Sequence, residues 1–451
     1  MLKNADGGVL IMRMYDIIDK KKKGICLSDE EIRFVIEGYS KDQIPDYQIS
    51  AFLMAVYFNG MTDHELVVLT EAMVKSGDEV DLSHISGIKV DKHSTGGVGD
   101  KTTLVVAPIV AACGGKVAKM SGRGLGFTGG TVDKLEAIPG TQTAIGEERF
   151  FEIVNSIGVS VIGQSAQIAI ADKKLYALRD VTATIDSIPL IASSIMSKKL
   201  AAGSDKIVLD VTIGSGAFMK NIDDAVELAK KMAAIGDGAG RETVAYLTNM
   251  DVPLGIATGN INEVIEAIET LKGNGPADFM EICLNFAGAM LCLSGFGTMD
   301  ECKVKAENAI KDGSALKKFA DMIHAQGGDE RYIYNTELFD KPEYNKAWIS
   351  DKDCYIEKMN TEMCGRTAVI LGAGREVKDS PIDFTAGIMF YKKTGDYVKK
   401  GEKIAEVFSS DKDKLEAGFE SLKAAYTVGD KKVKKMKEII AYVTKDNVVW
   451  Y

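Results

Sequence analysis

Residues 92–136 constrain this chain most, because two glycine-rich polar loops there flank one helical and one strand-like segment. The first loop reads KHSTGG (92–97) and the second reads SGRGLGFTGGT (121–131). Glycine lets backbone N–H groups approach a ligand closely, and the N-terminus of a helix adds partial positive charge. The stretch therefore predicts an anion pocket inside an α/β fold, with phosphate as its ligand.

Alternating strands and helices extend from these loops through the middle of the chain. Apolar runs predict buried strands at 117–120, 159–162, 207–211 and 243–248. Helical patterns cover 102–113 and 223–235. We assign residues 88–163 and 205–350 to one large α/β domain that binds phosphate.

Helical patterns also occupy residues 12–76 and return at 172–203. Two capping boxes, Ser28-x-x-Glu31 and Thr62-x-x-Glu65, precede apolar residues at helical spacing. Both segments are assigned to one discontinuous all-α domain, and residues 1–11 are expected to form an N-terminal extension.

The last part of the chain, residues 351–451, is predicted as an α+β region rich in strands. A polar stretch at 334–352 separates it from the α/β domain, and residues 384–408 resemble the strand and turn pattern of lipoyl- or biotinyl-like barrels. This pattern lacks an obvious carrier lysine at a hairpin tip, so we expect the region only to pack on the large domain or on a partner subunit. The predicted class is α/β with a discontinuous all-α domain, a large mixed sheet and a β-rich C-terminal region.

Charge and cysteine usage limit the classes of partner. The net charge of −10 argues against nucleic-acid binding, which needs a basic surface. The seven cysteines include no C-x-x-C pair, so neither a zinc site nor a disulfide framework is indicated. No apolar run reaches the length of a membrane span. We therefore expect a cytoplasmic protein without an organic cofactor, a nucleic-acid partner or a membrane partner.

The first loop combines a cation with neutral donors. Lys92 supplies charge, while Ser94 and the following glycine amides can orient a dianion. A nucleotide-triphosphatase loop is an alternative for GGVGDKT, but Asp100 stands where that motif requires glycine. The loop therefore favours a small anionic substrate.

The motifs KHSTGGVGD, AKMSGRG, SGRGLGFTGGTVDKLE, LYALRDVTAT, SIPLIASSIMSKK and GSGAF resemble those of the thymidine and pyrimidine-nucleoside phosphorylases. The resemblance covers nearly the whole chain from Met12 and implies a homodimer that uses inorganic phosphate and a pyrimidine nucleoside. It implies that the pyrimidine is contacted by Arg179, Ser194 and Lys198. It also implies that phosphate is bound by Lys92, Ser94, Thr103, Lys119, Ser121 and Thr131. Lys119 further matches the variants that accept both uridine and thymidine.

The chemistry of phosphorolysis fits these residue types. Breaking an N-glycosidic bond builds positive charge on the sugar and negative charge on the departing base, so a base-side donor and a sugar-side anion both help. Phosphate can be nucleophile and anion at once, which removes the need for paired carboxylates. His93 is the predicted catalytic donor to the base, because an imidazole can carry a proton near neutral pH. The two substrates would meet in a cleft between the domains, and closure would exclude water.

Two departures from the family pattern affect the expected cleft. Phe127 stands where the family usually has histidine, and Thr212 replaces a common lysine. These departures keep open a binding protein without catalysis on the same scaffold. A thymidine-only phosphorylase and an anthranilate-type phosphoribosyltransferase are further alternatives, and the latter would need magnesium, for which the chain offers no compact acidic motif beside the loops.

A third departure concerns potassium. The resemblance implies a potassium ion held by Gly99, Leu254, Ala257 and Glu266. Lys101, however, occupies a position where relatives that bind the ion use threonine. Either potassium binds here, or the Lys101 ammonium takes its place beside Glu266.

Overall fold

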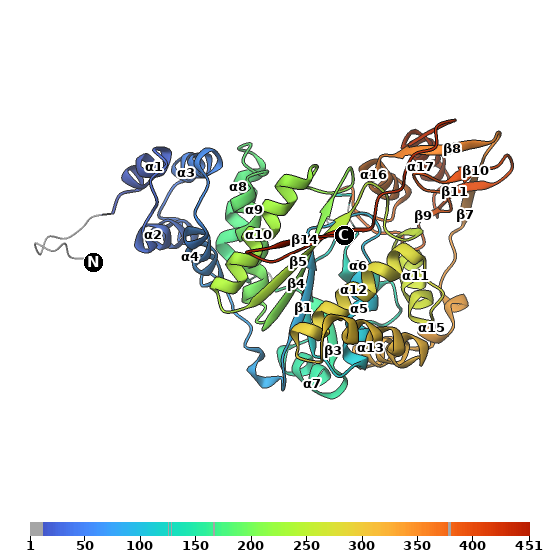
Figure 1. The fold of residues 1–451 in the computed structure, drawn as a ribbon, viewed down its shortest axis with the longest axis horizontal. Coiled ribbons are helices and arrows are strands. Elements are labelled where there is room, and N and C mark those ends of the chain that lie inside the picture. Colours follow the sequence, from blue (N-terminus) through green and yellow to red (C-terminus); the bar gives the residue numbers. More distant parts are fainter. Residues whose placement is uncertain (1–11, 125, 128, 166, 378–379) are drawn as a thin grey trace, which may run out of the picture.

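The computed structural model describes residues 12–124, 126–127, 129–165, 167–377 and 380–451. The extension predicted at 1–11 lies outside the described residues. Figure 1 shows helices at the N-terminal end, a sheet covered by helices in the middle and a small β-rich part at the other end. Across these ranges, no helix combines the length and the apolar character that a membrane crossing requires.

The helical part joins two distant segments of the chain. Its helices are α1 (Met14–Lys22), α2 (Asp29–Ser40), α3 (Asp46–Asn59), α4 (Asp63–Val74), α8 (Ile170–Asp180) and α9 (Ile188–Ala201). Both predicted capping boxes form, because the hydroxyls of Ser28 and Thr62 accept hydrogen bonds from backbone N–H groups three residues later. α4 packs on α9 and α2 packs on α8, so the two segments make one helical layer.

Parallel strands form the centre of the molecule. β1 (Val90–Ser94), β4 (Lys206–Ile213) and β5 (Glu242–Asn249) lie in the order β1-β4-β5. β2 (Val117–Ser121) and β3 (Val159–Gly163) form a parallel pair, and a bridge between Lys89 and Lys116 places β2 beside β1. The loops that follow β1 and β2 therefore leave the same edge, where ligands bind in open α/β sheets.

Helices bury both faces of this sheet. Ile207, Leu209 and Val211 of β4 join a core with α9 and α10 (Ile222–Gly238). Val208 of β4 points the other way, into a second core. The helices of this second core are α5 (Thr102–Ala112), α11 (Ile261–Leu271), α12 (Ala277–Leu293), α13 (Met299–Lys311) and α14 (Ser314–Ala325). Shorter elements complete this part: α6 (Thr131–Glu136), α7 (Glu147–Ile157), α15 (Arg331–Tyr334) and 3-10 turns at Leu82–His84 and Thr336–Leu338. Burial on both faces makes the sheet a fixed frame for its loops.

Two small sheets build the β-rich part. One has the order β6-β9-β11-β7 and contains β6 (Ala257–Gly259), β7 (Tyr344–Ile349), β9 (Gly387–Phe390) and β11 (Lys403–Ser409). The other has the order β10-β8-β12 and contains β8 (Cys354–Met359), β10 (Tyr397–Val398) and β12 (Tyr426–Gly429). They pack around α16 (Thr361–Leu371) and α17 (Lys412–Ala424).

The fold class is as predicted, but two predicted ranges need correction. The polar stretch at 334–352 is not only a separator, because β7 lies within it and pairs with β11. The range 351–451 is not wholly apart from the large domain, because β13 (Ile439–Val443) pairs antiparallel with β5 and is followed by β14 (Val448–Trp450). Alternation predicts that a strand forms but not which strand it pairs with.

Candidate functional site

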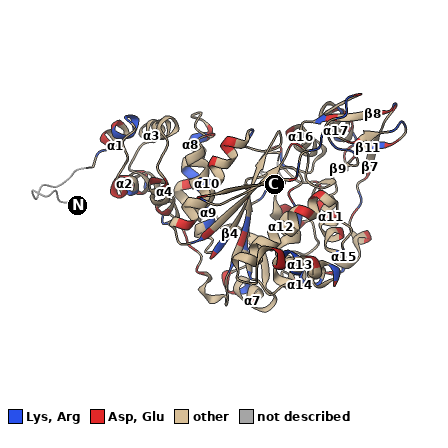
Figure 2. Cartoon of the chain, in the orientation of Figure 1, with Lys and Arg blue, Asp and Glu red and all other residues tan. Residues whose placement is uncertain are grey.

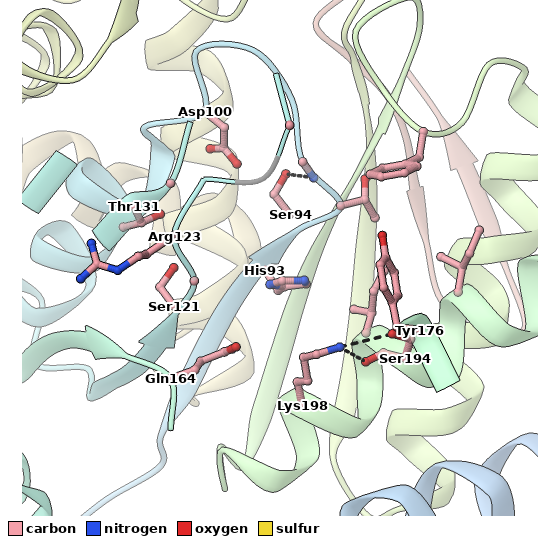
Figure 3. A pocket seen from close by; sticks show the side chains of 18 of the residues that line it. His93, Ser94, Asp100, Ser121, Arg123, Thr131, Gln164, Tyr176, Ser194 and Lys198 are labelled. Atoms are coloured by element: carbon pink, nitrogen blue, oxygen red, sulfur yellow. Dashed lines mark hydrogen bonds between the residues drawn. The ribbon is translucent and has the colours of Figure 1, made fainter. Parts of the chain in front are cut away.

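A cavity of about 910 Å³ lies between two walls of the molecule. The α/β wall consists of residues 92–103 and the described residues of 119–131, and the helical wall consists of α8 and α9. The cavity is lined by ten predicted site residues: Lys92, His93, Ser94, Thr103, Lys119, Ser121, Thr131, Arg179, Ser194 and Lys198. Figure 3 shows His93 between Ser121 and Thr131 on one side and Ser194 and Lys198 on the other. The structure thus brings both predicted groups to one cavity.

Lys92 is held by carboxylates at the edge of the α/β wall. Its Nζ lies 3.2 Å from Asp210 and 3.5 Å from Asp100, and it donates to the Thr102 hydroxyl. Burial opposes the charge on Lys92, but the carboxylates of Asp100 and Asp210 raise the pKa of this lysine above its ordinary value. Lys92 therefore brings a fixed positive charge to the cavity, and this charge is paired with two carboxylates.

Asp91 links two further lysines behind the cavity. Its carboxylate lies 2.9 Å from Lys119 and 3.1 Å from Lys199, and all three side chains are buried. Burial, helped by the like charge of Lys199, lowers the pKa of Lys119 to about 8 although Asp91 opposes the shift. Lys119, predicted to bind phosphate, lines the cavity but directs its ammonium to Asp91 and to the backbone carbonyl of Lys92.

The surroundings of His93 favour its neutral imidazole, whereas the sequence led us to expect an imidazole that carries a proton near neutral pH. Burial and the neighbouring ammonium groups of Lys199 and Lys119 lower the pKa of His93 well below its ordinary value. A neutral imidazole still carries one N–H, so it can donate a hydrogen bond without donating its proton. The sequence reveals the histidine, but the two lysines that set its charge come from β2 and α9.

Side chains outside the predicted set fix the two glycine-rich loops. Thr212 Oγ1 donates to the carbonyl of Gly96 at 2.6 Å, and its backbone N–H donates to the Thr95 hydroxyl at 3.1 Å. Asp133 accepts hydrogen bonds from the Gly124 N–H at 2.8 Å and from Arg375 at 2.9 Å. One departure from the family pattern, Thr212, therefore has a structural role in the first loop.

Phe127, another departure, faces the β-rich part of the molecule. The guanidinium carbon of Arg366 in α16 lies 5.8 Å from the centre of its ring. Gly365 is so close that a Cβ there would lie 2.6 Å from the Phe127 carbonyl. The phenyl ring thus joins the second loop to α16 by packing, where a histidine would offer a hydrogen bond.

The helical wall carries three predicted residues that differ in exposure and in hydrogen bonding. Arg179 is 2% exposed, and its guanidinium donates to the carbonyls of Thr184, Ile185 and Leu190. Lys198 has a side chain that is 36% exposed, pairs with Asp172, and donates to the Ser194 hydroxyl at 3.2 Å. Arg179 therefore holds the turn between α8 and α9, whereas Lys198 is directed into the cavity (Figure 3).

Several cavity residues were not predicted. Tyr176 and Asp172 of α8 line the cavity three and seven residues before Arg179, a spacing that places them on one helix face. Their spacing from Arg179 could have indicated both residues from the sequence. Phe218 also lines the cavity, and its place in the motif GSGAF was a local signal for it. Gln164 lines the cavity too, but it follows a strand in a distant segment and carries no local signal. Isoleucines 185, 191 and 195 give this side an apolar surface that suits a flat heterocycle.

The four residues predicted to hold potassium all contact Lys101. Its Nζ lies 2.9 Å from the carbonyl of Gly99, 2.8 Å from that of Leu254, 3.1 Å from that of Ala257 and 2.9 Å from a Glu266 carboxylate oxygen. Because the ammonium occupies the space among these four oxygens, the residues present do not fit a potassium ion in addition. Within the described ranges, no group of three or more His, Cys, Asp or Glu residues gathers to hold a metal ion.

Three family models match the chain. Residues 86–316 match the glycosyl transferase family, a/b domain, and residues 15–77 match the helical bundle domain of the same family. Residues 355–429 match the pyrimidine nucleoside phosphorylase C-terminal domain.

Two relatives that are similar over most of the chain share one name. The chain is 53% identical to the pyrimidine-nucleoside phosphorylase of Geobacillus stearothermophilus over 400 residues, which cover 88% of this chain and 92% of the relative. It is 51% identical to that of Staphylococcus aureus (strain N315) over 420 residues, which cover 93% of this chain and 97% of the relative. Anthranilate phosphoribosyltransferase from Thermus thermophilus has a similar fold, with a TM-score of 0.56 at 19% identity, over 69% of this chain and 99% of that one.

Proposed function

This chain belongs to the pyrimidine-nucleoside phosphorylase family, and we propose that its cavity binds inorganic phosphate on the α/β wall and the pyrimidine base of a nucleoside on the helical wall. The enzyme is a pentosyltransferase that cleaves pyrimidine nucleosides by phosphorolysis. One observation carries the proposal: the ten predicted residues, from segments far apart in sequence, line a single cavity.

The proposed reaction transfers the sugar from nitrogen to oxygen. A phosphate oxygen bonds to C1′ while the bond from C1′ to the base nitrogen breaks, and the bonding electrons leave with the base. The proton of monohydrogen phosphate passes to the base, which gives free pyrimidine and α-D-ribose 1-phosphate or its 2-deoxy form. Holding both reactants in one cavity supplies the proximity that this displacement needs.

On the α/β wall, hydroxyl groups orient phosphate. Ser94 ends β1 and Ser121 ends β2, while Thr103 is the second residue of α5 and Thr131 begins α6. Lys92 in β1 supplies positive charge. The N-terminus of α5 adds partial positive charge to the same region.

On the helical wall, Ser194 and Lys198 donate to the polar edge of the pyrimidine, and Arg179 retains donors beyond those bound to carbonyls. His93 lies between the walls and donates its N–H to the base oxygen on which negative charge develops. A neutral imidazole is suited to this role, because the donated bond strengthens as charge builds in the transition state.

Closure of the two walls is part of the proposal. The cavity volume is near the upper end of the roughly 300–1,000 Å³ usual for small-molecule sites, which suits an open state. The connections at 76–90, 163–172 and 203–206 lie together: the Asp78 N–H donates to the Gln167 carbonyl, and the Asp205 N–H donates to the Lys89 carbonyl. A disulfide cross-link between these connections is expected to lower kcat more than phosphate affinity; unchanged kcat in the cross-linked form contradicts closure.

Partners and location are also part of the proposal. Tyr15, Tyr47 and Phe58 are exposed on α1 and α3, which supports a homodimer formed through the helical part. All seven cysteines are free thiols, as suits a reducing cytoplasm. Figure 2 shows acidic and basic residues interspersed along the described ribbon, which together with the net charge of −10 supports small-molecule substrates over nucleic acid.

Ultraviolet absorbance of uridine, thymidine and deoxyuridine, each with and without phosphate, tests the function. Cleavage of all three that requires phosphate is the expected result. Phosphate-independent cleavage indicates a hydrolase, thymidine cleavage alone indicates a thymidine phosphorylase, and no cleavage indicates a binding protein. Cleavage only with pyrophosphate and magnesium indicates a phosphoribosyltransferase.

A further inference from the structure

Lys101 is the best enclosed cation of the α/β wall. Its side chain has no exposed surface, and four oxygens from two chain segments surround its Nζ at 2.8–3.1 Å. The ring centre of Phe279 lies 4.9 Å from the same nitrogen. Three carbonyl oxygens and one carboxylate form a cage that requires a single positive charge.

The cage joins two loops that have no strand pairing with each other. Gly99 and Lys101 belong to the loop before α5, whereas Leu254 belongs to the turn before β6 and Ala257 begins that strand. Glu266 strengthens the turn, because its carboxylate accepts hydrogen bonds from the N–H groups of Ile256 at 2.7 Å and Ala257 at 2.8 Å. The cage therefore fixes one side of the loop before α5.

That loop positions groups that face the proposed phosphate. Asp100, the preceding residue, contacts Lys92, and Thr103, two residues later, lines the cavity. A shift of the loop before α5 would move both the charge partner of Lys92 and a hydroxyl of the α/β wall. Lys101 touches neither substrate site, so its effect on binding is through position.

We propose that Lys101 is a tethered internal cation that positions the phosphate loop in place of a bound potassium ion. The enzyme then needs no monovalent cation from solution, and the same cage without the lysine side chain becomes a site for one. The proposal rests on the proposed function only for its kinetic readout, because thermal stability reports the occupancy of the cage without substrate.

The experiment compares wild-type enzyme with Lys101→Thr in buffers whose only cation is tetramethylammonium, sodium or potassium, at equal ionic strength. Wild-type Tm, kcat and KM for phosphate are expected to be the same in all three. Lys101→Thr is expected to have a lower Tm in tetramethylammonium and a KM for phosphate raised about tenfold, because the charge of Glu266 is then buried without its cationic partner. Potassium should restore both in a saturable manner, since a ligand that binds only the folded state raises its stability with concentration.

Lys134→Thr is the matched control. Lys134 is also fully buried and pairs with Glu263 at 2.9 Å, but it donates to a single backbone carbonyl, that of Asp100, at 2.8 Å. This variant should lose stability without recovery in potassium. A potassium-dependent rise in wild-type Tm or activity overturns the proposal. So does a Lys101→Thr enzyme that stays unfolded, or is not restored, in potassium, or equal restoration of Lys134→Thr.

Discussion

The two walls of the cavity hold their charges in opposite ways. On the α/β wall, Lys92, Lys101 and Lys119 are buried, and each is matched to a carboxylate. On the helical wall, Lys198 is partly exposed, and its surroundings include the apolar side chains of α9. The lysines of the α/β wall are thus fixed, whereas the helical wall combines an apolar surface and the buried Arg179 with two more exposed lysines, Lys173 and Lys198.

This contrast suits the two proposed ligands. Phosphate is small and highly charged, so preorganised donors lower the cost of holding it. A pyrimidine is flat and mostly apolar, so a surface with few polar groups can bind it and leave room for movement on closure. Substitutions on one wall at a time test this difference between the walls.

Removing a carboxylate should cost much more stability on the α/β wall than on the helical wall. Asp91→Ala leaves the two buried ammonium groups of Lys119 and Lys199 without this carboxylate and is expected to lower the free energy of unfolding by roughly 3–5 kcal/mol. Asp172→Ala leaves Lys198 in contact with solvent and should cost about 1 kcal/mol. Urea unfolding followed by circular dichroism measures both, and equal losses would contradict the contrast.

His93→Ala should lower kcat by about 10²–10³, the usual cost of removing one donor to developing charge. The KM for phosphate should change little, because His93 is proposed to contact the base and not the anion. Steady-state kinetics with uridine and varied phosphate separate the two effects. A loss below about tenfold would assign the donor role to Arg179 or Lys198.

Deleting one hydroxyl on each wall should raise the KM for a different substrate. Thr103→Val on the α/β wall is expected to raise the KM for phosphate about tenfold, because a hydrogen bond to a charged group is lost. Ser194→Ala on the helical wall should raise the KM for the nucleoside severalfold and leave that for phosphate unchanged. If both variants raise the same KM, the division of ligands between the walls is wrong.

The smallest expected effect is a pH dependence of stability that comes from His93. Its pKa is lower in the folded protein than its ordinary value of 6.5, because burial and two ammonium groups disfavour the imidazolium. The unfolded chain therefore takes up the proton first, so the stability from neutral His93 is present above pH 6.5 and is lost as pH falls toward the folded pKa. Unfolding free energies between pH 5 and 7 should fall less steeply in His93→Gln than in wild type, and parallel slopes would contradict the shift.

Much of the fold could be predicted because its signals are local. The capping boxes at Ser28 and Thr62 need only three residues of context, and the alternation of strands and helices after residue 88 needs only short windows. Strand partners are not local. The pairing of β13 with β5 joins residues almost 200 positions apart, and nothing in either segment specifies the other.

The site shows the same limit. The sequence indicated which residues gather at the cavity, because motifs preserve residue type and spacing. It could not show that Lys119 turns to Asp91, or that Arg179 is bound to three backbone carbonyls. These details depend on the packing of β1 beside β2 and of α8 beside α9, and they decide whether a predicted cation is available to a ligand.

The return of the chain end to the central sheet has a mechanical consequence. The β-rich part is attached through β6 and the chain before β7 at one end, and through β13 at the other, so it cannot swing as a separate arm. If the helical part rotates, it must do so relative to one unit that contains residues 257–259, the two small sheets and the five-stranded sheet. Deleting the last dozen residues would therefore expose the edge of β5 and release one of the two anchors of this unit.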